Sequence, residues 1–144
     1  MEPHVPDILH AIQLVVAPVF LLTAVGTLIN ALNARLGRAV DRRRVLEAKL
    51  PEFVNEQAED AREELARIAR RIRLVYSAIL FAVLCALFVC LLIAGAFAGG
   101  FVATDVSRVV AGLFVLAMLA LIVSLLLFLR EIFLAVSTPR HVPR

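Results

Sequence analysis

Formal charge is missing from three long stretches of this 144-residue chain, residues 8–34, 74–104 and 109–129. These stretches hold no Asp, Glu, Lys or Arg over 27, 31 and 21 residues. A helix needs about 20 residues to cross the hydrocarbon of a bilayer, so each stretch is long enough. Hydrophobic residues make up 62% of the chain, whereas they make up about half of a soluble domain, and the mean hydropathy is +0.93. The sequence therefore predicts three transmembrane helices and excludes an ordinary soluble domain.

Cysteine and N-terminal basic residues are also scarce. The chain has two cysteines, Cys85 and Cys90, five residues apart on different faces of one predicted helix. They cannot pair with each other, and we interpret them as small packing residues. Residues 1–7 carry no Lys or Arg, whereas a secretory signal peptide begins with a basic region. We expect the first apolar stretch to remain in the protein as a membrane span.

Recognisable catalytic motifs are absent from the sequence. It contains no Ser-His-Asp set, zinc-protease motif, phosphate loop or pair of intramembrane carboxylates. His4 and His10 flank Asp7, but a six-residue separation without a rigid scaffold is a weak metal signal, and we interpret them as solvated. We therefore expect a protein that is not an enzyme and has no cofactor or metal.

The charge that the apolar stretches lack is concentrated in residues 35–73. This block holds 19 of the 27 formal charges and 11 of the 15 basic residues. Basic residues that flank membrane helices stay in the cytoplasm, so we expect the N-terminus outside and the C-terminus inside. Arginines at a cytoplasmic membrane face attract anionic lipid headgroups rather than nucleic acid. The candidates for headgroup contact are Arg42, Arg43, Arg44, Arg67, Arg70, Arg71 and Arg73. The alternative is that these arginines only set the orientation and form ion pairs with Asp41, Glu47 and Glu131.

The charged block is expected to form two helical arms that turn at Pro51, because proline cannot continue a helix. Residues 52–98 contain no proline, and apolar residues recur there at the four-three spacing of a coiled-coil seam. The seam comprises Val54, Ala58, Ala61, Leu65, Ile68, Ile72 and Val75, and its spacing continues through Ile79, Ala82, Ala86, Val89, Ile93 and Ala96. The fold class we expect is an all-α membrane protein with three transmembrane helices. The first two extend into a cytoplasmic antiparallel helical hairpin.

The expected organisation is a single membrane domain. Its segments are the spans 8–34, 74–98 and 109–129, the hairpin 35–73, an outer loop 99–108 and a cytoplasmic tail 130–144. Glu131, just past the third span, is placed to meet Arg35 or Arg38 at the inner boundary.

Small residues recur at every fourth position of the second span, which lets helix backbones approach closely in lipid. The candidates for helix packing are Ala78, Ala82, Ala86, Cys90 and Ala94. A four-residue step drifts about 40° per repeat, so these residues should serve two neighbours, one of them another subunit. An alanine-rich composition would also produce such a run without any interface.

A polar stripe runs along the first span at steps of three or four residues. It comprises Thr23, Gly26, Thr27, Asn30 and Asn33. Polar side chains that face lipid are costly, so the stripe should face protein or water. Several copies around an axis would line a pore with Thr23, Thr27, Asn30 and Asn33. The alternative is that these residues make hydrogen bonds between packed helices.

Two segments carry a resemblance to a known family. They are Ala17-Pro18-Val19-Phe20-Leu21-Leu22 through Asn30, Arg35-Leu36, Arg38 and Asp41-Arg42, and the closing run 125–128 with Leu129-Arg130-Glu131. The chain resembles a bacterial family of small membrane proteins known as domain of unknown function 2721. The resemblance implies a three-helix protein of the bacterial inner membrane, and it implies no activity, substrate or catalytic residue.

Two functions follow from these patterns as hypotheses. The first is an oligomeric, ion-permeable pore lined by the first span. The second is a non-catalytic scaffold or adaptor whose basic hairpin binds anionic lipid or a partner protein. Both assume a homo-oligomer, and neither has a known small-molecule substrate.

Overall fold

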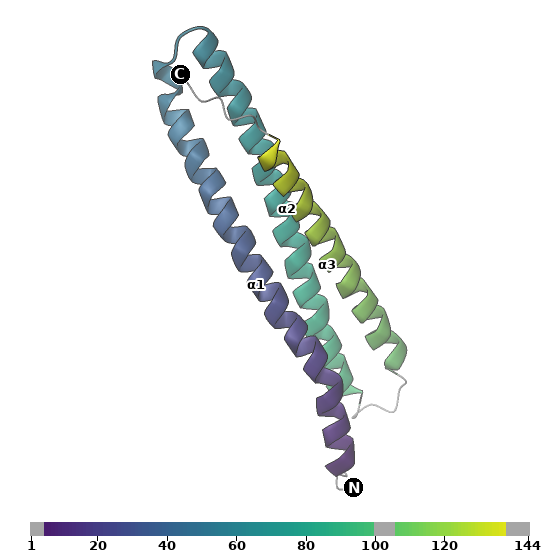
Figure 1. Cartoon of the computed structure of the whole chain (residues 1–144). Coiled ribbons are helices and arrows are strands. Elements are labelled where there is room, and N and C mark those ends of the chain that lie inside the picture. The colour runs from purple at the N-terminus through teal and green to yellow at the C-terminus, as the bar shows by residue number, and fades with distance from the viewer. Residues whose placement is uncertain (1–4, 100–105, 138–144) are drawn as a thin grey trace. The chain divides into compact units, whose positions relative to one another are not determined.

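The computed structural model describes residues 5–99 and 106–137 of the chain. They form three α-helices, α1 (Val5–Lys49), α2 (Glu56–Ala98) and α3 (Ser107–Val136), and one short 3-10 helix, η1 (Leu50–Glu52). Figure 1 shows them in chain order, from α1, purple at its N-terminal end, to α3 in green and yellow. No strand occurs within the described residues. The all-α class expected from the sequence is confirmed.

The connection between α1 and α2 contains Pro51. Proline has no N–H to donate to the preceding turn, and α1 ends at Lys49, two residues earlier. Asn55 then adopts a φ of 53°, a left-handed conformation that asparagine tolerates better than most residues. Its carbonyl accepts hydrogen bonds from the amides of Ala58 and Glu59, at 3.0 and 3.3 Å, which starts α2.

The chain divides into two compact units, each built from parts of the three helices. The first comprises the chain up to Ile29 and Phe81–Val123. Its core is made mostly of small side chains, which allow α2 and α3 to approach closely. The buried members are Val25, Ala82, Cys85, Val89, Ala117 and Ala120.

The second unit comprises Asn30–Leu80 and the chain from Ser124 onward. Its buried apolar residues are Leu32, Ala61, Ile68, Ile72, Val75 and Ala78. Two polar residues of α3, Ser124 and Glu131, are buried with them at 0% and 2% exposure. The Ser124 hydroxyl donates a 2.7 Å hydrogen bond to the Ala78 carbonyl of α2. Buried polar side chains thus connect α3 to the other helices of this unit.

The apolar seam of α2 follows the expected spacing only in part. Val54 is 68% exposed because it precedes the first residue of α2. Ala82 and Val89 are buried as the spacing requires. Before, between and after these two residues, the buried positions are Ala78, Cys85 and Leu92. The expected Ile79, Ala86 and Ile93 are half-buried. Each of these positions is one residue, about 100° around the helix, from the expected one, while Ala82 and Val89 keep their place. The buried face differs because α2 here contacts both α1 and α3.

The third helix is longer than its uncharged stretch. The sequence places the end of the helix near Arg130 and Glu131, but α3 continues to Val136. The helix continues because arginine and glutamate are good helix formers, so the end of an uncharged stretch does not end a helix.

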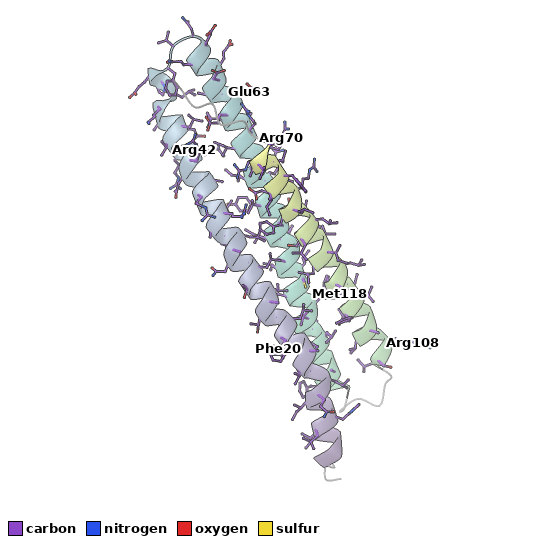
Figure 2. The ribbon with its side chains drawn as sticks, viewed as in Figure 1. Phe20, Arg42, Glu63, Arg70, Arg108 and Met118 are labelled. Atoms are coloured by element: carbon purple, nitrogen blue, oxygen red, sulfur yellow. The ribbon has the colours of Figure 1, made fainter. Side chains whose placement is uncertain are left out.

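Most apolar side chains of the long uncharged stretches are exposed. The most hydrophobic 18-residue windows of the three helices have mean hydropathies of 2.2, 3.0 and 3.0, yet only 11%, 28% and 17% of their residues are buried. Phe20 on α1 is 71% exposed and is labelled in Figure 2. Apolar surface of this extent requires a lipid or protein partner. Length and composition therefore make all three helices candidate membrane spans.

Candidate functional site

Glu131 of α3 binds two arginines from the other helices of its unit. Its Oε2 accepts a hydrogen bond from Arg35 Nη1 of α1 at 2.9 Å. Its Oε1 accepts hydrogen bonds from Arg71 Nη2 and Nε of α2, at 2.9 and 3.3 Å. The carboxylate is 2% exposed, and each arginine side chain is 34% exposed. We call these three residues the Glu131 cluster.

The Glu131 cluster lies where the uncharged stretches of all three helices end. Arg35 is the first charge after residues 8–34, Arg71 lies three residues before residue 74, and Glu131 lies two residues after residue 129. The guanidinium of Arg35 also lies over the Phe128 ring, 5.0 Å from its centroid. This contact adds a cation–π attraction. The cluster therefore lies where each of the three helices changes from apolar to charged sequence.

For Glu131, the sequence favoured Arg35 or Arg38 as the partner and left Arg71 among several arginines that could also pair with it. The expected contact with Arg35 is confirmed. The second partner, Arg71, belongs to the basic clusters that were expected either at lipid headgroups or in ion pairs with Asp41, Glu47 and Glu131, and it pairs with Glu131. Arg71 lies three residues after Ile68 and four before Val75, both buried, so this spacing is the signal that could have placed it near the inward face.

A cleft of about 280 Å³ lies between the charged parts of α1 and α2. Its lining is mainly arginine and comprises Arg35, Arg38, Ala39, Arg42, Glu64, Arg67, Ile68 and Arg71. We call it the arginine cleft. Arg42 donates to Glu64 Oε1 through Nη2 and Nε, at 2.7 and 3.1 Å, which ties α1 to α2. Figure 2 labels Arg42 on α1, and Glu63 and Arg70 on α2.

The seven arginines proposed for lipid headgroups fall into two groups. Arg42, Arg67 and Arg71 line the arginine cleft. The remaining four, Arg43, Arg44, Arg70 and Arg73, are exposed outside it. Arg43 pairs with Glu47 one turn away on the same helix, at 2.7 Å. Within the described residues, Arg44, Arg70 and Arg73 form no ion pair.

The polar stripe lies on the exposed side of α1. Thr23, Thr27, Asn30 and Asn33 are all exposed. The buried residue Val25 lies two residues from both threonines, and Leu32 lies two residues from Asn30. Two residues correspond to about 200° around a helix, so three stripe residues lie roughly opposite the buried side of α1. Asn33, one residue from Leu32, lies at the edge of the exposed face.

The hydroxyls of the stripe bond within their own helix. Thr27 Oγ1 donates to the Thr23 carbonyl at 3.0 Å, and Thr23 Oγ1 donates to the Val19 carbonyl at 3.4 Å. For the Asn30 and Asn33 amides, no hydrogen bond to another described residue is formed. Both residues are exposed, so their amide groups are accessible to a partner outside the protomer.

The small-residue stripe of α2 is divided between buried and exposed positions. Ala78 and Ala82 are 0% exposed, and Ala86 is half-buried. Cys90 and Ala94 are exposed. Ser124, which bonds to the backbone at Ala78, was not singled out from the sequence. One serine in a long apolar stretch has no periodic pattern to reveal it.

No group of three or more His, Cys, Asp and Glu residues that could hold a metal ion occurs in the described part of the chain. His10 is exposed. His4 lies outside the described residues, and so do residues 100–105 of the expected loop 99–108.

Three helices long and apolar enough to cross a bilayer indicate the class of multi-pass membrane proteins. The chain belongs to the family described as Protein of unknown function (DUF2721), whose model matches residues 15–141. The match includes the polar stripe, the arginine cleft and Glu131. Comparison with curated proteins and with solved structures gave no match.

Proposed function

We propose that the protein lies in the bacterial cytoplasmic membrane with its N-terminus outside and its C-terminus inside. The concentration of arginine in residues 35–73 supports this orientation. The Glu131 cluster would then lie at the inner boundary of the bilayer. Beyond it, the arms of α1 and α2 would form an antiparallel hairpin that reaches about 20 Å into the cytoplasm. The Arg42–Glu64 hydrogen bonds support the pairing of the two arms.

We further propose that copies of the chain assemble around α1 and that the assembly conducts ions. The observation that carries this proposal is the exposure of Thr23, Thr27, Asn30 and Asn33 on a membrane-spanning helix. An amide that faces hydrocarbon loses its hydrogen bonds to water at a cost of several kcal/mol. A closed symmetric ring would instead turn the stripe towards a shared axis. Rings of amide and hydroxyl groups along such an axis would hold water and ions.

The exposed small residues of α2 support self-assembly independently. Cys90 and Ala94 contact no core of the protomer, and small exposed side chains allow a neighbouring subunit to approach closely in lipid. The proposal includes no catalytic step, cofactor, metal or nucleic-acid partner. Its lipid partners are the anionic phospholipids of the cytoplasmic leaflet.

Ion flux into proteoliposomes tests the proposed pore. Asn30→Leu keeps the branched shape of the side chain but replaces a ring of amides with apolar groups, which favours dewetting of the axis. We expect the flux of permeant cations or anions to fall about tenfold or more, which corresponds to a barrier increase of about 1.4 kcal/mol.

Ser77→Ala is the matched control for the flux measurement. Ser77 lies on α2, and its hydroxyl donates to the Arg73 carbonyl at 3.0 Å within its own helix. Because Ser77 is not part of the polar stripe, its loss should leave flux unchanged. Equal flux in the wild type and Asn30→Leu would contradict the proposal. So would the absence of any flux from a reconstituted oligomer.

A scaffold or adaptor is the second candidate function. The observation in its favour is the set of exposed arginines outside the cleft, Arg44, Arg70 and Arg73, which form no ion pair within the described residues. Such side chains are available to anionic lipid or an acidic partner protein. A stable oligomer that conducts neither cations nor anions would favour this function over the pore.

A further inference from the structure

The arginine cleft has more positive charge than its acidic residues neutralise. Its lining contains five arginines and one glutamate, a net formal charge of +4. Glu64 is already bound to Arg42. Glu131 lies outside the lining and binds both Arg35 and Arg71, so it neutralises one of their two positive charges. Substantial positive charge therefore remains inside one concave site.

Two of the cleft arginines have guanidinium groups available for a ligand. Arg38 is exposed and forms no ion pair with another described residue. Arg67 lies 3.8 Å from Glu63, in a pair whose side chains are 48% and 72% exposed. An exposed pair of this kind is worth less than about 1 kcal/mol, so it would yield easily to a stronger acceptor. Arg38 comes from α1 and Arg67 from α2, so one ligand would bridge the two helices.

We propose that the arginine cleft binds a phosphate group, supplied either by the headgroup of an anionic phospholipid or by a free phosphate or pyrophosphate. Planar guanidinium groups bind phosphate oxygens through paired hydrogen bonds. The volume of about 280 Å³ is at the lower end for small-molecule sites, which suits one or two phosphate groups rather than a large ligand. The cleft begins at Arg35 and Arg71, where the uncharged stretches end, and this is the level of headgroups in a spanning protein.

The proposed site differs from a general attraction between a basic surface and an anionic membrane. It requires Arg38, which lines the cleft, and it does not require Arg44 or Arg70, which lie outside the lining. It is also independent of whether ions pass along α1. Binding without flux would leave the phosphate site intact while excluding the pore.

The test uses the full-length protein and two probes. Isothermal titration calorimetry measures the Kd of inorganic pyrophosphate in a neutral detergent. Native mass spectrometry measures retention of phosphatidylglycerol after reconstitution in an equal mixture with phosphatidylcholine. The cleft variant is Arg38→Gln with Arg67→Gln, and the control is Arg44→Gln with Arg70→Gln. Each removes one charge from α1 and one from α2.

The cleft variant should weaken binding of at least one probe about tenfold or more, because each arginine contributes charged hydrogen bonds. The control should weaken it less than about threefold. Loss confined to phosphatidylglycerol identifies the lipid as the source, and loss confined to pyrophosphate identifies a soluble phosphate. Equal loss in both variants, or no binding of either probe to the wild type, would overturn the proposal. Arg38→Gln alone should still weaken binding about threefold, and circular dichroism verifies that each variant is folded.

Discussion

Replacing Glu131 with glutamine is expected to lower the free energy of unfolding by about 3 kcal/mol. The carboxylate is 2% exposed and accepts hydrogen bonds from both Arg35 and Arg71. Glutamine keeps the volume but removes the negative charge, which leaves two guanidinium groups facing each other. Removal of one partner from a buried ion pair typically costs about 3 to 5 kcal/mol. The lower end applies because each arginine is 34% exposed and can regain some hydration.

The loss can be measured by reversible unfolding in mixed micelles, followed by circular dichroism. Glu63→Gln is the matched control because Glu63 is 72% exposed and lies 3.8 Å from Arg67. Exposed pairs contribute about 0 to 1 kcal/mol, so the control should change stability little. If the two substitutions destabilise the protein equally, the Glu131 cluster does not hold the helices together.

Ala82→Leu is expected to destabilise the protein by about 2 kcal/mol or more. Ala82 is 0% exposed in the core of the first unit, and Ala117 of α3 belongs to the same core at 0% exposure. Close packing leaves no space for three additional carbon atoms, so α2 and α3 would have to separate or strain their side chains. The same micelle unfolding measurement reports this loss.

Ala94→Leu is the matched control on the same helix. Ala94 belongs to the same four-residue repeat but is exposed, so the added side chain meets no atom of the protomer core. The free energy of unfolding of the Ala94→Leu protomer should change by less than about 0.5 kcal/mol. Equal losses at Ala82 and Ala94 would contradict the division of this repeat into buried and exposed positions.

The helices could be predicted from the sequence because their signals are local. Long uncharged stretches identify the spans, and Pro51 marks the end of the first helix. From Ala61 to Val75, every buried residue of α2 belongs to the predicted seam. Further along, contact with both α1 and α3 moves the buried positions to Cys85 and Leu92. The spacing of apolar residues along one helix does not reveal where two neighbouring helices lie against it.

The candidate sites show the same limit. Arg35 and Glu131 could be paired from the sequence because each closely follows the end of an apolar stretch. Arg71 is one of several basic residues near the end of its stretch, so composition alone does not select it from the possible partners of Glu131. The arginine cleft depends on which arginines of α1 and α2 face each other. Which arginines face each other depends on how the helices pack, and the number of charges along the chain does not reveal it.

The central claim is that the polar stripe of α1 faces water within the membrane. Cysteine accessibility tests it most directly, in a protein carrying Cys85→Ala and Cys90→Ala and reconstituted in liposomes. Thr27→Cys would lie about 12 Å from Arg35 along α1. Leu80→Cys is the control, about 10 Å from Arg73 on α2, where Leu80 is 58% exposed.

A thiol reacts with a charged, membrane-impermeant thiosulfonate only as the thiolate, which requires water. The account predicts rapid modification of Thr27→Cys with loss of ion flux, and no modification of Leu80→Cys. Equal lack of reaction at the two positions would contradict the claim that the stripe lines an aqueous axis.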